Sequence, residues 1–226
     1  MVHYRNMDQI PERYTAVLLN RIHEYEDVYT FIFEKPIDLT FEAGSYAHVL
    51  IPTVFAPERS VREISFASPP SDDTIAFSII TTSKSPWQIK LLELKNGDAV
   101  TLFKIKSHLT VPTQGILVMI ANGIGITPFR SIIKEHYKKD ISCILVHVGR
   151  NNYLYKNELT ELPLTQYRIA REEIEATINL IIKQHIDAKY MIAGSPLFVE
   201  NIASSLKENG ISEENIQLDS FKGLID

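Results

Sequence analysis

The 226-residue sequence predicts a small antiparallel β-barrel followed by a doubly wound α/β domain. Up to about residue 111, short segments rich in β-branched and aromatic residues alternate with turn signals, which is typical of antiparallel strands. From residue 116 onward, strand-like apolar runs alternate with amphipathic helical stretches, which is typical of a parallel sheet covered by helices. The polar segment 111–115 separates the two patterns, so the predicted domains are residues 1–112 and 113–226.

Six strands and one helix are predicted in the first domain. Six short strands at this spacing favour a small antiparallel barrel. Turn signals occur at residues 72–73 and 96–98. The strands are expected at residues 14–19, 28–33, 46–51, 64–67, 74–80 and 99–105, and the helix at residues 86–94.

Five strands and four helices are predicted in the second domain. Residues 116–120 form an apolar run without polar alternation, as expected of a strand buried on both faces. Gly210 suits the position just after a helix. The strands are expected at residues 116–120, 142–148, 167–169, 190–192 and 216–218, and the helices at 128–138, 156–162, 171–184 and 196–209.

Composition and charge exclude several function classes. The net charge is −5 and there is no basic run, so nucleic acid is not an expected partner. The single cysteine, Cys143, excludes an internal disulfide and four-cysteine metal or iron–sulfur sites. The seven histidines show no metal-ligand spacing. No signal peptide and no membrane-spanning apolar stretch are evident, so a cytoplasmic location is expected.

Residues 115–130, GILVMIANGIGITPFR, contain the main candidate ligand site. Gly123 and Gly125 permit a tight turn and allow backbone amides to approach a ligand. Thr127 suits a helix N-cap and Pro128 the first helical position, so the turn offers free N–H groups to a phosphate. The alternative is a tight loop of any α/β domain, because the G-x-G-x-x-G fingerprint is absent.

Arg62 and Ser65, on a predicted strand, are a second candidate pair. An arginine binds phosphate bidentately and stays charged, and a serine hydroxyl two or three residues away can approach the same ligand face. The alternative is a surface arginine beside an ordinary strand serine.

Several motifs in register resemble those of the ferredoxin–NADP reductase family. Residues 62–70 read REISFASPP, which resembles the family's flavin motif R-x-Y-S-x-A-S-x-P. Residues 41–46 resemble F-x-x-G-Q-Y, and residues 96–98 match its N/P-G-D turn. The strings GIGITPFRS at 123–131 and YMIAGSP at 190–196 resemble its nicotinamide elements. The order and spacing agree from about Arg13 to Phe221.

The resemblance implies an N-terminal flavin-binding barrel. Arg62 would hold the flavin phosphate or pyrophosphate, and Ser65, the predicted catalytic residue, would hydrogen-bond near flavin N5. Ile64 stands where the family has a stacking tyrosine. Ser83 and Ser85 would hold further phosphate oxygens at the start of the helix. The implied flavin-binding residues are Arg62, Glu63, Ile64, Ser65, Ser83 and Ser85, and the cofactor is FAD, with FMN as the alternative.

The resemblance also implies an NAD(P)-binding second domain. Gly194 and Ser195 would line the nicotinamide side, and Phe221 would lie near the flavin, a core aromatic being the alternative. Arg150, at the end of the second parallel strand, favours the 2′-phosphate of NADP over NAD, a solvated charge being the alternative. The implied nicotinamide-binding residues are Gly123, Gly125, Ile126, Thr127, Pro128, Arg150, Gly194 and Ser195.

The implied function is a flavin-dependent NAD(P)H oxidoreductase that passes a hydride to flavin N5 and electrons to a separate acceptor such as ferredoxin or flavodoxin. Three departures from the family pattern stand out. Ala193 replaces a cysteine beside the nicotinamide, which is expected to leave that volume partly empty. Residues 102–106 replace a G-P-x-G turn, and residues 159–171 are compact. Ala193 and the altered region around Lys104 motivate an alternative, a flavin-binding accessory or sensor protein without efficient nicotinamide turnover.

Overall fold

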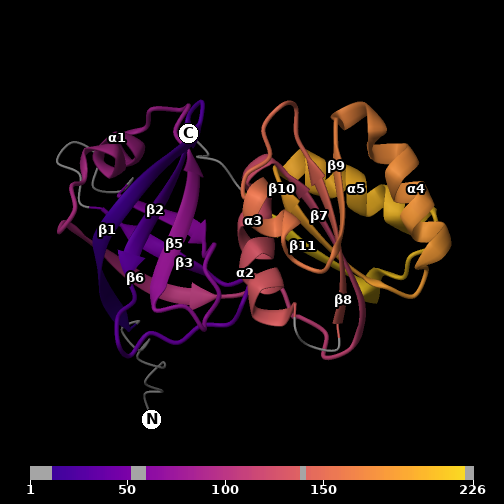
Figure 1. The fold of residues 1–226 in the computed structure, drawn as a ribbon, viewed down its shortest axis with the longest axis horizontal. Coiled ribbons are helices and arrows are strands. Elements are labelled where there is room, and N and C mark those ends of the chain that lie inside the picture. The colour runs from indigo at the N-terminus through magenta and orange to yellow at the C-terminus, as the bar shows by residue number, and fades with distance from the viewer. Residues whose placement is uncertain (1–11, 52–59, 138–140, 222–226) are drawn as a thin grey trace, which may run out of the picture.

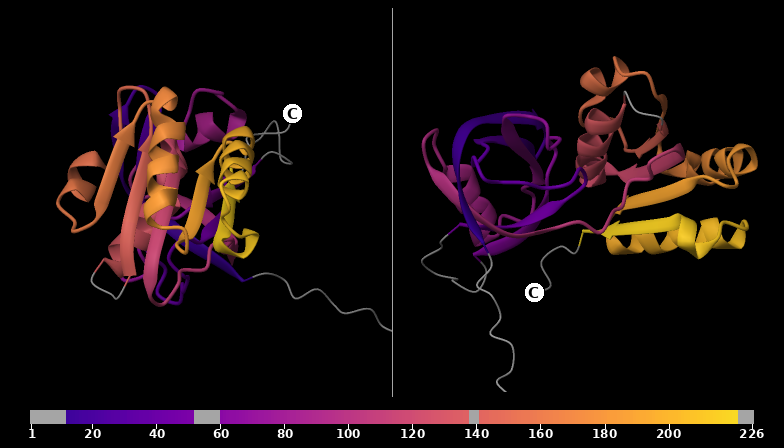
Figure 2. Two further views of the ribbon diagram at one scale, coloured as in Figure 1. Left: turned by 90° about the vertical axis from the view of Figure 1, so that its right-hand side faces the viewer. Right: turned by 90° about the horizontal axis from the view of Figure 1, so that it is seen from below.

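The computed structural model describes residues 12–51, 60–137 and 141–221, which form two sheets lying side by side (Figure 1). The first is a six-stranded antiparallel sheet and the second a five-stranded parallel sheet. The right-hand view of Figure 2 shows the curled first sheet beside the helix-covered second sheet. The predicted fold class is confirmed.

The first sheet has the order β4-β3-β6-β1-β2-β5. Strand β1 pairs with β6 through its first half and with β2 through its second half, so it curves across the sheet. The amide of Ala67, just after β4, donates to Ala76 of β5 at 2.7 Å, which brings the two edge strands together into a barrel. The strands are β1 (Arg13–Tyr25), β2 (Val28–Glu34), β3 (Tyr46–Leu50), β4 (Val61–Ser65), β5 (Thr74–Ile80) and β6 (Ala99–Lys106).

One helix, α1 (Pro86–Glu93), covers the barrel core. Its Trp87 and Leu91 are almost completely buried among the barrel side chains. The Trp87 indole N–H donates to the carbonyl of Val49 at 3.2 Å, so the one polar atom of this large side chain is satisfied. The helix is therefore fixed to the barrel by both packing and a hydrogen bond.

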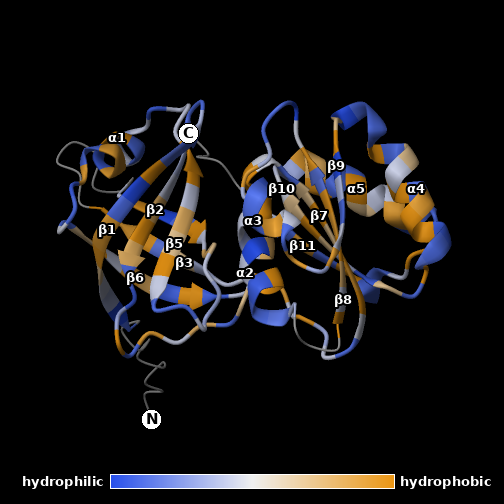
Figure 3. Cartoon of the chain, in the orientation of Figure 1, coloured by the Kyte–Doolittle hydropathy of each residue, from blue (hydrophilic) through white to orange (hydrophobic). Residues whose placement is uncertain are grey.

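The second sheet has the order β11-β10-β7-β8-β9. Helices α2 and α3 pack on the face that carries Leu117, Met119 and Leu145, and α4 and α5 pack on the opposite face. Figure 3 shows the resulting hydrophobic strands between amphipathic helices. The elements are β7 (Gly115–Asn122), β8 (Ile141–Val148), β9 (Thr165–Ile169), β10 (Lys189–Gly194), β11 (Ile216–Ser220), α2 (Ile126–His136), α3 (Lys156–Thr160), α4 (Ile174–Gln184) and α5 (Pro196–Glu208).

Three short 3-10 helices complete the described elements: η2 (Gly123–Gly125), η3 (Arg171–Glu173) and η4 (Glu213–Asn215). The chain leaves β7 toward β8 on one side and later returns to β10 on the other. The order of strands therefore reverses between β7 and β10, and ligands of doubly wound sheets bind at the carboxyl ends of the strands at such a point.

The predicted strands and helices are all present. Most ends differ by three residues or fewer, but β1 continues six residues past its predicted end, and the predicted helix at 171–184 begins as the 3-10 turn η3. The prediction for the start of α2 is wrong: the helix begins at Ile126, so Thr127 is not the N-cap and Pro128 is the third helical residue. The 3-10 turn η2 continues directly into α2, so the helix starts two residues earlier in the chain than predicted. Lys138, the last residue of that predicted helix, lies outside the described residues. The boundary at residues 112–113 stays a prediction. In residues 12–51, 60–137 and 141–221, no helix combines the length and the apolar composition of a membrane span.

Candidate functional site

The carboxyl ends of β7, β10 and β11 meet at one edge of the parallel sheet. In register, Ala121 of β7 lies beside Ala193 of β10, which lies beside Asp219 of β11. Residues 122–125, 194–195 and 219–221 therefore gather where the strand order reverses. We call these three segments the switch-point site. It contains four of the predicted nicotinamide-side residues and Phe221.

The two glycines of the turn have different structural roles. Gly123 has φ +53° and open space within 4 Å of the place where a Cβ would lie. A Cβ on Gly125 would lie 2.2 Å from the carbonyl oxygen of Ala193, so Gly125 is required for η2 to pack against β10. The sequence predicted both glycines as ligand-approach positions; the geometry shows that a side chain would fit at Gly123 but not at Gly125.

Two side chains hold the turn in place. The Thr127 hydroxyl donates to the carbonyl of Ile124 at 2.6 Å. The His147 Nε2 lies 2.9 Å from the carbonyl oxygen of Gly123, and because a carbonyl only accepts, Nε2 carries the hydrogen. Burial lowers the pKa of His147 to about 4, so the ring is neutral at physiological pH. Thr127 thus stabilises the glycine turn through its hydrogen bond to Ile124, although it is not the N-cap of the helix.

Phe221 lies beside Gly194 at the end of the sheet. Its backbone N–H donates to the Gly194 carbonyl at 2.8 Å, and its side chain is partly exposed. Ser195 is exposed and precedes α5, and no hydrogen bond from its side chain caps that helix. The structure therefore places Gly194, Ser195 and Phe221 together at the switch-point site. Arg150 is exposed after the end of β8, one strand away.

Ala193 differs from its sequence-based interpretation. Its side chain is fully buried in the apolar cluster that includes Ala121, Ile126 and Phe129. The methyl group therefore packs in the protein interior, rather than lining a surface that a nicotinamide could reach directly.

The predicted flavin residues divide between the two faces of β4. Arg62 lies opposite Val49 and Ile64 opposite Ala47, both core residues, so this face turns toward the barrel interior. Since side chains alternate along a strand, Glu63 and Ser65 lie on the other face. Arg62 and Ser65 are three positions apart, an odd offset, so the strand directs them to opposite faces and not to the single ligand face that was expected.

On the second face of β4, Ser65 is paired with Tyr46 of β3 and Glu63 with His48. The His48 Nε2 lies 3.1 Å from a Glu63 carboxylate oxygen. Tyr46 stacks on His108, with ring centroids 4.8 Å apart. This face presents a row of aromatic and ionisable side chains.

Ser83 and Ser85 lie at the start of α1. The Ser85 side chain is the N-cap and accepts from the Gln88 amide at 3.3 Å. The Ser83 hydroxyl donates to the Gln88 side chain at 2.7 Å. Both predicted phosphate-binding hydroxyls are thus already hydrogen-bonded, and they face the same residue.

Asp219 is a site residue that the sequence reasoning missed. It is 6% exposed, near the end of β11, and is electrostatically coupled to Tyr46 and Glu63 across the interface between the sheets. Burial, with a further contribution from the Glu63 carboxylate, raises the pKa of Asp219 to about 7. The sequence did contain a sign of this residue's position. An acidic side chain directly follows the alternating apolar residues Ile216 and Leu218 at the end of the last predicted strand.

Sequence comparison identifies ferredoxin–NADP reductases as relatives. The chain is 28% identical over 159 residues to a flavodoxin/ferredoxin–NADP reductase of Buchnera aphidicola, a match covering 63% of this chain and 64% of the relative. It is 28% identical over 157 residues to ferredoxin–NADP reductase of Azotobacter vinelandii, covering 65% of this chain and 60% of the relative. The matches thus span less than two thirds of either relative. No protein-family model matches the sequence.

Solved structures agree over nearly the whole chain. A ferredoxin NADP+ reductase of Neisseria gonorrhoeae, solved with bound FAD and NADP, superposes with a TM-score of 0.80 at 18% identity and covers 93% of this chain and 99% of its own. The ferredoxin reductase in carbazole 1,9a-dioxygenase superposes with a TM-score of 0.79 at 16% identity, covering 94% of this chain and 70% of its own.

An antiparallel barrel followed by a parallel sheet whose switch point faces that barrel defines a class of two-domain proteins. Within this class, the chain is ferredoxin–NADP reductase-like in sequence and in fold, and the resemblance drawn from its motifs is confirmed.

Proposed function

We propose that the chain is a flavin-dependent NAD(P)H oxidoreductase that passes electrons to a separate acceptor. The observation that carries this proposal is the meeting of two candidate surfaces: the switch-point site of the parallel sheet faces the Tyr46, Glu63 and Ser65 side of the barrel through Asp219. The names of the Buchnera and Azotobacter relatives support ferredoxin or flavodoxin as the acceptor.

The switch-point site fits a nicotinamide dinucleotide. Open space at Gly123 and exposure of Ser195 leave backbone and side-chain donors accessible at the ends of β7 and β10. The adjoining helix N-terminus favours a phosphate group. Arg150 would select the 2′-phosphate of NADP(H), in agreement with the NADP bound to the Neisseria enzyme. We therefore assign residues 113–226 to NADP(H), with Gly123, Gly194, Ser195 and Arg150 as contacts.

The barrel fits a flavin on the side that faces the switch-point site. Ser65 would donate its hydroxyl near N5, and the start of α1 with Ser83 and Ser85 would receive phosphate oxygens. Arg62, on the other face of β4, would reach a phosphate only around the edge of the strand. Bound FAD would supply the hydride acceptor and the one-electron chemistry. We therefore assign residues 1–112 to FAD, with FMN as the alternative.

Asp219 would hold or release a proton at its carboxyl oxygen between the two domains. Because its pKa is about 7, both protonation states are populated near neutral pH. Proton-transferring groups are most effective when their pKa lies near the working pH. Asp219 is therefore suited to exchange a proton between the switch-point site and the barrel face that carries Glu63.

A second candidate, a flavin-binding protein without nicotinamide turnover, is favoured by one observation. Ile64 packs against the barrel core, in the position of the family's stacking tyrosine. An aliphatic side chain there offers no aromatic ring to hold a flavin in place.

One spectrum separates the two candidates. The purified protein is loaded with FAD and mixed anaerobically with NADPH or NADH. The oxidoreductase is expected to lose its flavin absorbance, faster with NADPH than with NADH. A protein that retains bound flavin and keeps its absorbance with both nucleotides would support the second candidate. A protein that binds no flavin would contradict both.

A further inference from the structure

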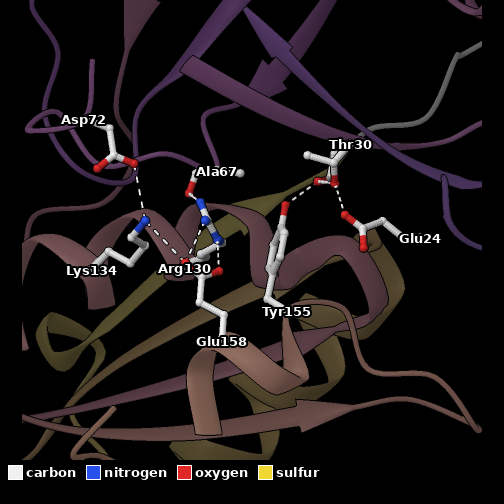
Figure 4. Close-up of polar contacts among 9 residues, drawn as sticks. Glu24, Thr30, Ala67, Asp72, Arg130, Lys134, Tyr155 and Glu158 are labelled. Carbon is white, nitrogen blue, oxygen red and sulfur yellow. Dashed lines mark hydrogen bonds and ion pairs between the residues drawn. The ribbon is translucent and has the colours of Figure 1, made fainter. Parts of the chain in front are cut away.

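We propose that Arg130 is a positioning residue that fixes the glycine turn of the α/β domain against the β4 end of the barrel. The proposal deepens the proposed function, on which it rests. Arg130 belongs to a group of side chains between the two sheets that we call the interdomain cluster (Figure 4). Its members are Glu24, Thr30, Asp72, Ser78, Arg130, Lys134, Tyr155 and Glu158.

Glu158 fixes the orientation of the Arg130 guanidinium. The Nε and Nη2 atoms donate to the two carboxylate oxygens at 2.6 and 2.8 Å, which is a bidentate pair. Such a pair sets the plane of the guanidinium and leaves the remaining nitrogen in a defined direction. Although burial opposes the effect, Arg130 holds the pKa of Glu158 below its ordinary value, so the carboxylate stays charged.

The remaining nitrogen contacts the barrel. Nη1 of Arg130 donates to the carbonyl of Ala67 at 2.7 Å. Ala67 lies two residues after Ser65, and its own amide closes the barrel by donating to Ala76. On the other side, Arg130 lies in α2, five residues after Gly125. One side chain thus links the turn of the switch-point site to the strand end that carries Ser65.

The surroundings limit the freedom of this link. The guanidinium carbon lies 4.8 Å from the centroid of the Tyr155 ring, and the Arg130 side chain is 14% exposed. Tyr155 has φ +61°, in the left-handed region, and its hydroxyl is hydrogen-bonded to Ser78 of β5. A tyrosine held in that conformation requires support from its contacts. Arg130 is thereby held between a ring, a carboxylate and a backbone carbonyl.

Lys134 provides a matched control within the same cluster. Its ammonium lies 3.3 Å from both Asp72 and Glu158, and the side chain is 26% exposed. It bridges the same two domains but makes no contact with Ala67 among those described. Removing Lys134 therefore weakens an interdomain ion pair and leaves the link from α2 to the β4 end in place.

The first experiment compares Arg130→Gln, Arg130→Lys and Lys134→Gln in the FAD-loaded protein by stopped-flow reduction with NADPH. Since small misplacements of reacting groups cost up to about a hundredfold, Arg130→Gln is expected to lower the limiting rate by at least about tenfold. Its NADPH dissociation constant should stay within about twofold. Arg130→Lys, which keeps the charge but not the fork, should fall between Arg130→Gln and the parent protein, whereas Lys134→Gln should match the parent. Equal loss in both Gln variants, or no loss in Arg130→Gln, would overturn the proposal.

A second measurement needs no cofactor. Hydrogen–deuterium exchange of the apoprotein should show faster exchange in residues 66–76 and 123–130 of Arg130→Gln than of Lys134→Gln. Unchanged exchange in these segments would overturn the link itself. If the parent protein fails to reduce FAD, the proposed function fails, and this exchange result still decides whether Arg130 holds the two segments together.

Discussion

The barrel meets the α/β domain in two regions, and these differ in whether the surroundings stabilise the charged form of the ionisable side chains. In the interdomain cluster, Arg130 and Glu158 form a bidentate pair, and Lys134 lies near two carboxylates. At the switch-point site, Asp219 is buried near a second acid, Glu63, and its pKa is raised to about 7. The first region stabilises the charged form of its groups, and the second destabilises it.

This difference indicates a division of roles. Paired charges with complete hydrogen bonds give fixed geometry. A buried acid with a raised pKa is unfavourable for stability, and such groups are concentrated at functional sites. The interface thus contains one region suited to holding the two domains and one suited to binding and proton exchange. Substitutions in these two regions should separate the two roles.

Gly125→Ala tests the packing at the switch point. The new Cβ would lie 2.2 Å from the Ala193 carbonyl oxygen, so β10 or α2 must move, and we expect a loss of about 4 kcal/mol or more in the free energy of unfolding. Gly123→Ala, with open space and φ +53°, should cost only about 1–2 kcal/mol. Urea denaturation measures both. Equal costs would show that Gly125 does not form this contact.

Asp219→Asn tests the raised pKa. The folded-state pKa of about 7 exceeds the ordinary 3.8, so the folded protein binds the extra proton and its stability falls as pH rises through this window. The variant lacks this loss, and we expect it to be about 2–4 kcal/mol more stable than the parent near pH 8 and nearly equal near pH 4, in the absence of cofactor. A variant that is less stable than the parent at pH 8 would contradict the assignment.

Ala193→Cys tests whether this position has room. Because Ala193 is fully buried, the added sulfur should cost about 1 kcal/mol of stability and should not speed flavin reduction. This reverses the expectation from sequence, which was that the substitution would fill an empty volume beside the nicotinamide. A faster single-turnover reduction in the variant would restore that expectation.

Arg150→Ala should have the smallest effect on stability, within about 0.5 kcal/mol, because the side chain is exposed. Its expected effect is on specificity. We expect the ratio of kcat/KM for NADPH over NADH to fall by about tenfold, since a charged contact with the 2′-phosphate is lost. An unchanged ratio would show that another group selects the nucleotide.

The architecture could be predicted from the sequence because the signals for strands, helices and turns lie in residues that are close together in the chain. Strands such as β5 (Thr74–Ile80) are β-branched, apolar and bounded by turns, and β7 is a continuous apolar run. Motif resemblance assigned Gly123, Gly194 and Ser195 to the nicotinamide and Phe221 to the neighbourhood of the flavin, and the structure places these residues close together at the end of the parallel sheet.

Other features depend on long-range geometry that no local pattern contains. The contact of Gly125 with Ala193 joins residues far apart in the chain, and the bond from Arg130 to Ala67 spans 63 residues. The separation of Arg62 from Ser65 follows from strand alternation and was available in the sequence. The pKa of Asp219 could not be predicted, since it depends on burial between the two domains.

The protonation of Asp219 reports whether FAD and NADP+ bind between the switch-point site and the barrel. Infrared difference spectra of the parent protein minus Asp219→Asn, recorded across pH, report the carboxyl group itself. We predict an apparent pKa near 7 without cofactor, and a clear change of the carboxyl band when FAD and NADP+ are added. A carboxyl that is fully ionised at pH 5 and unaffected by bound FAD and NADP+ would contradict the placement of the cofactor site between Asp219 and the barrel.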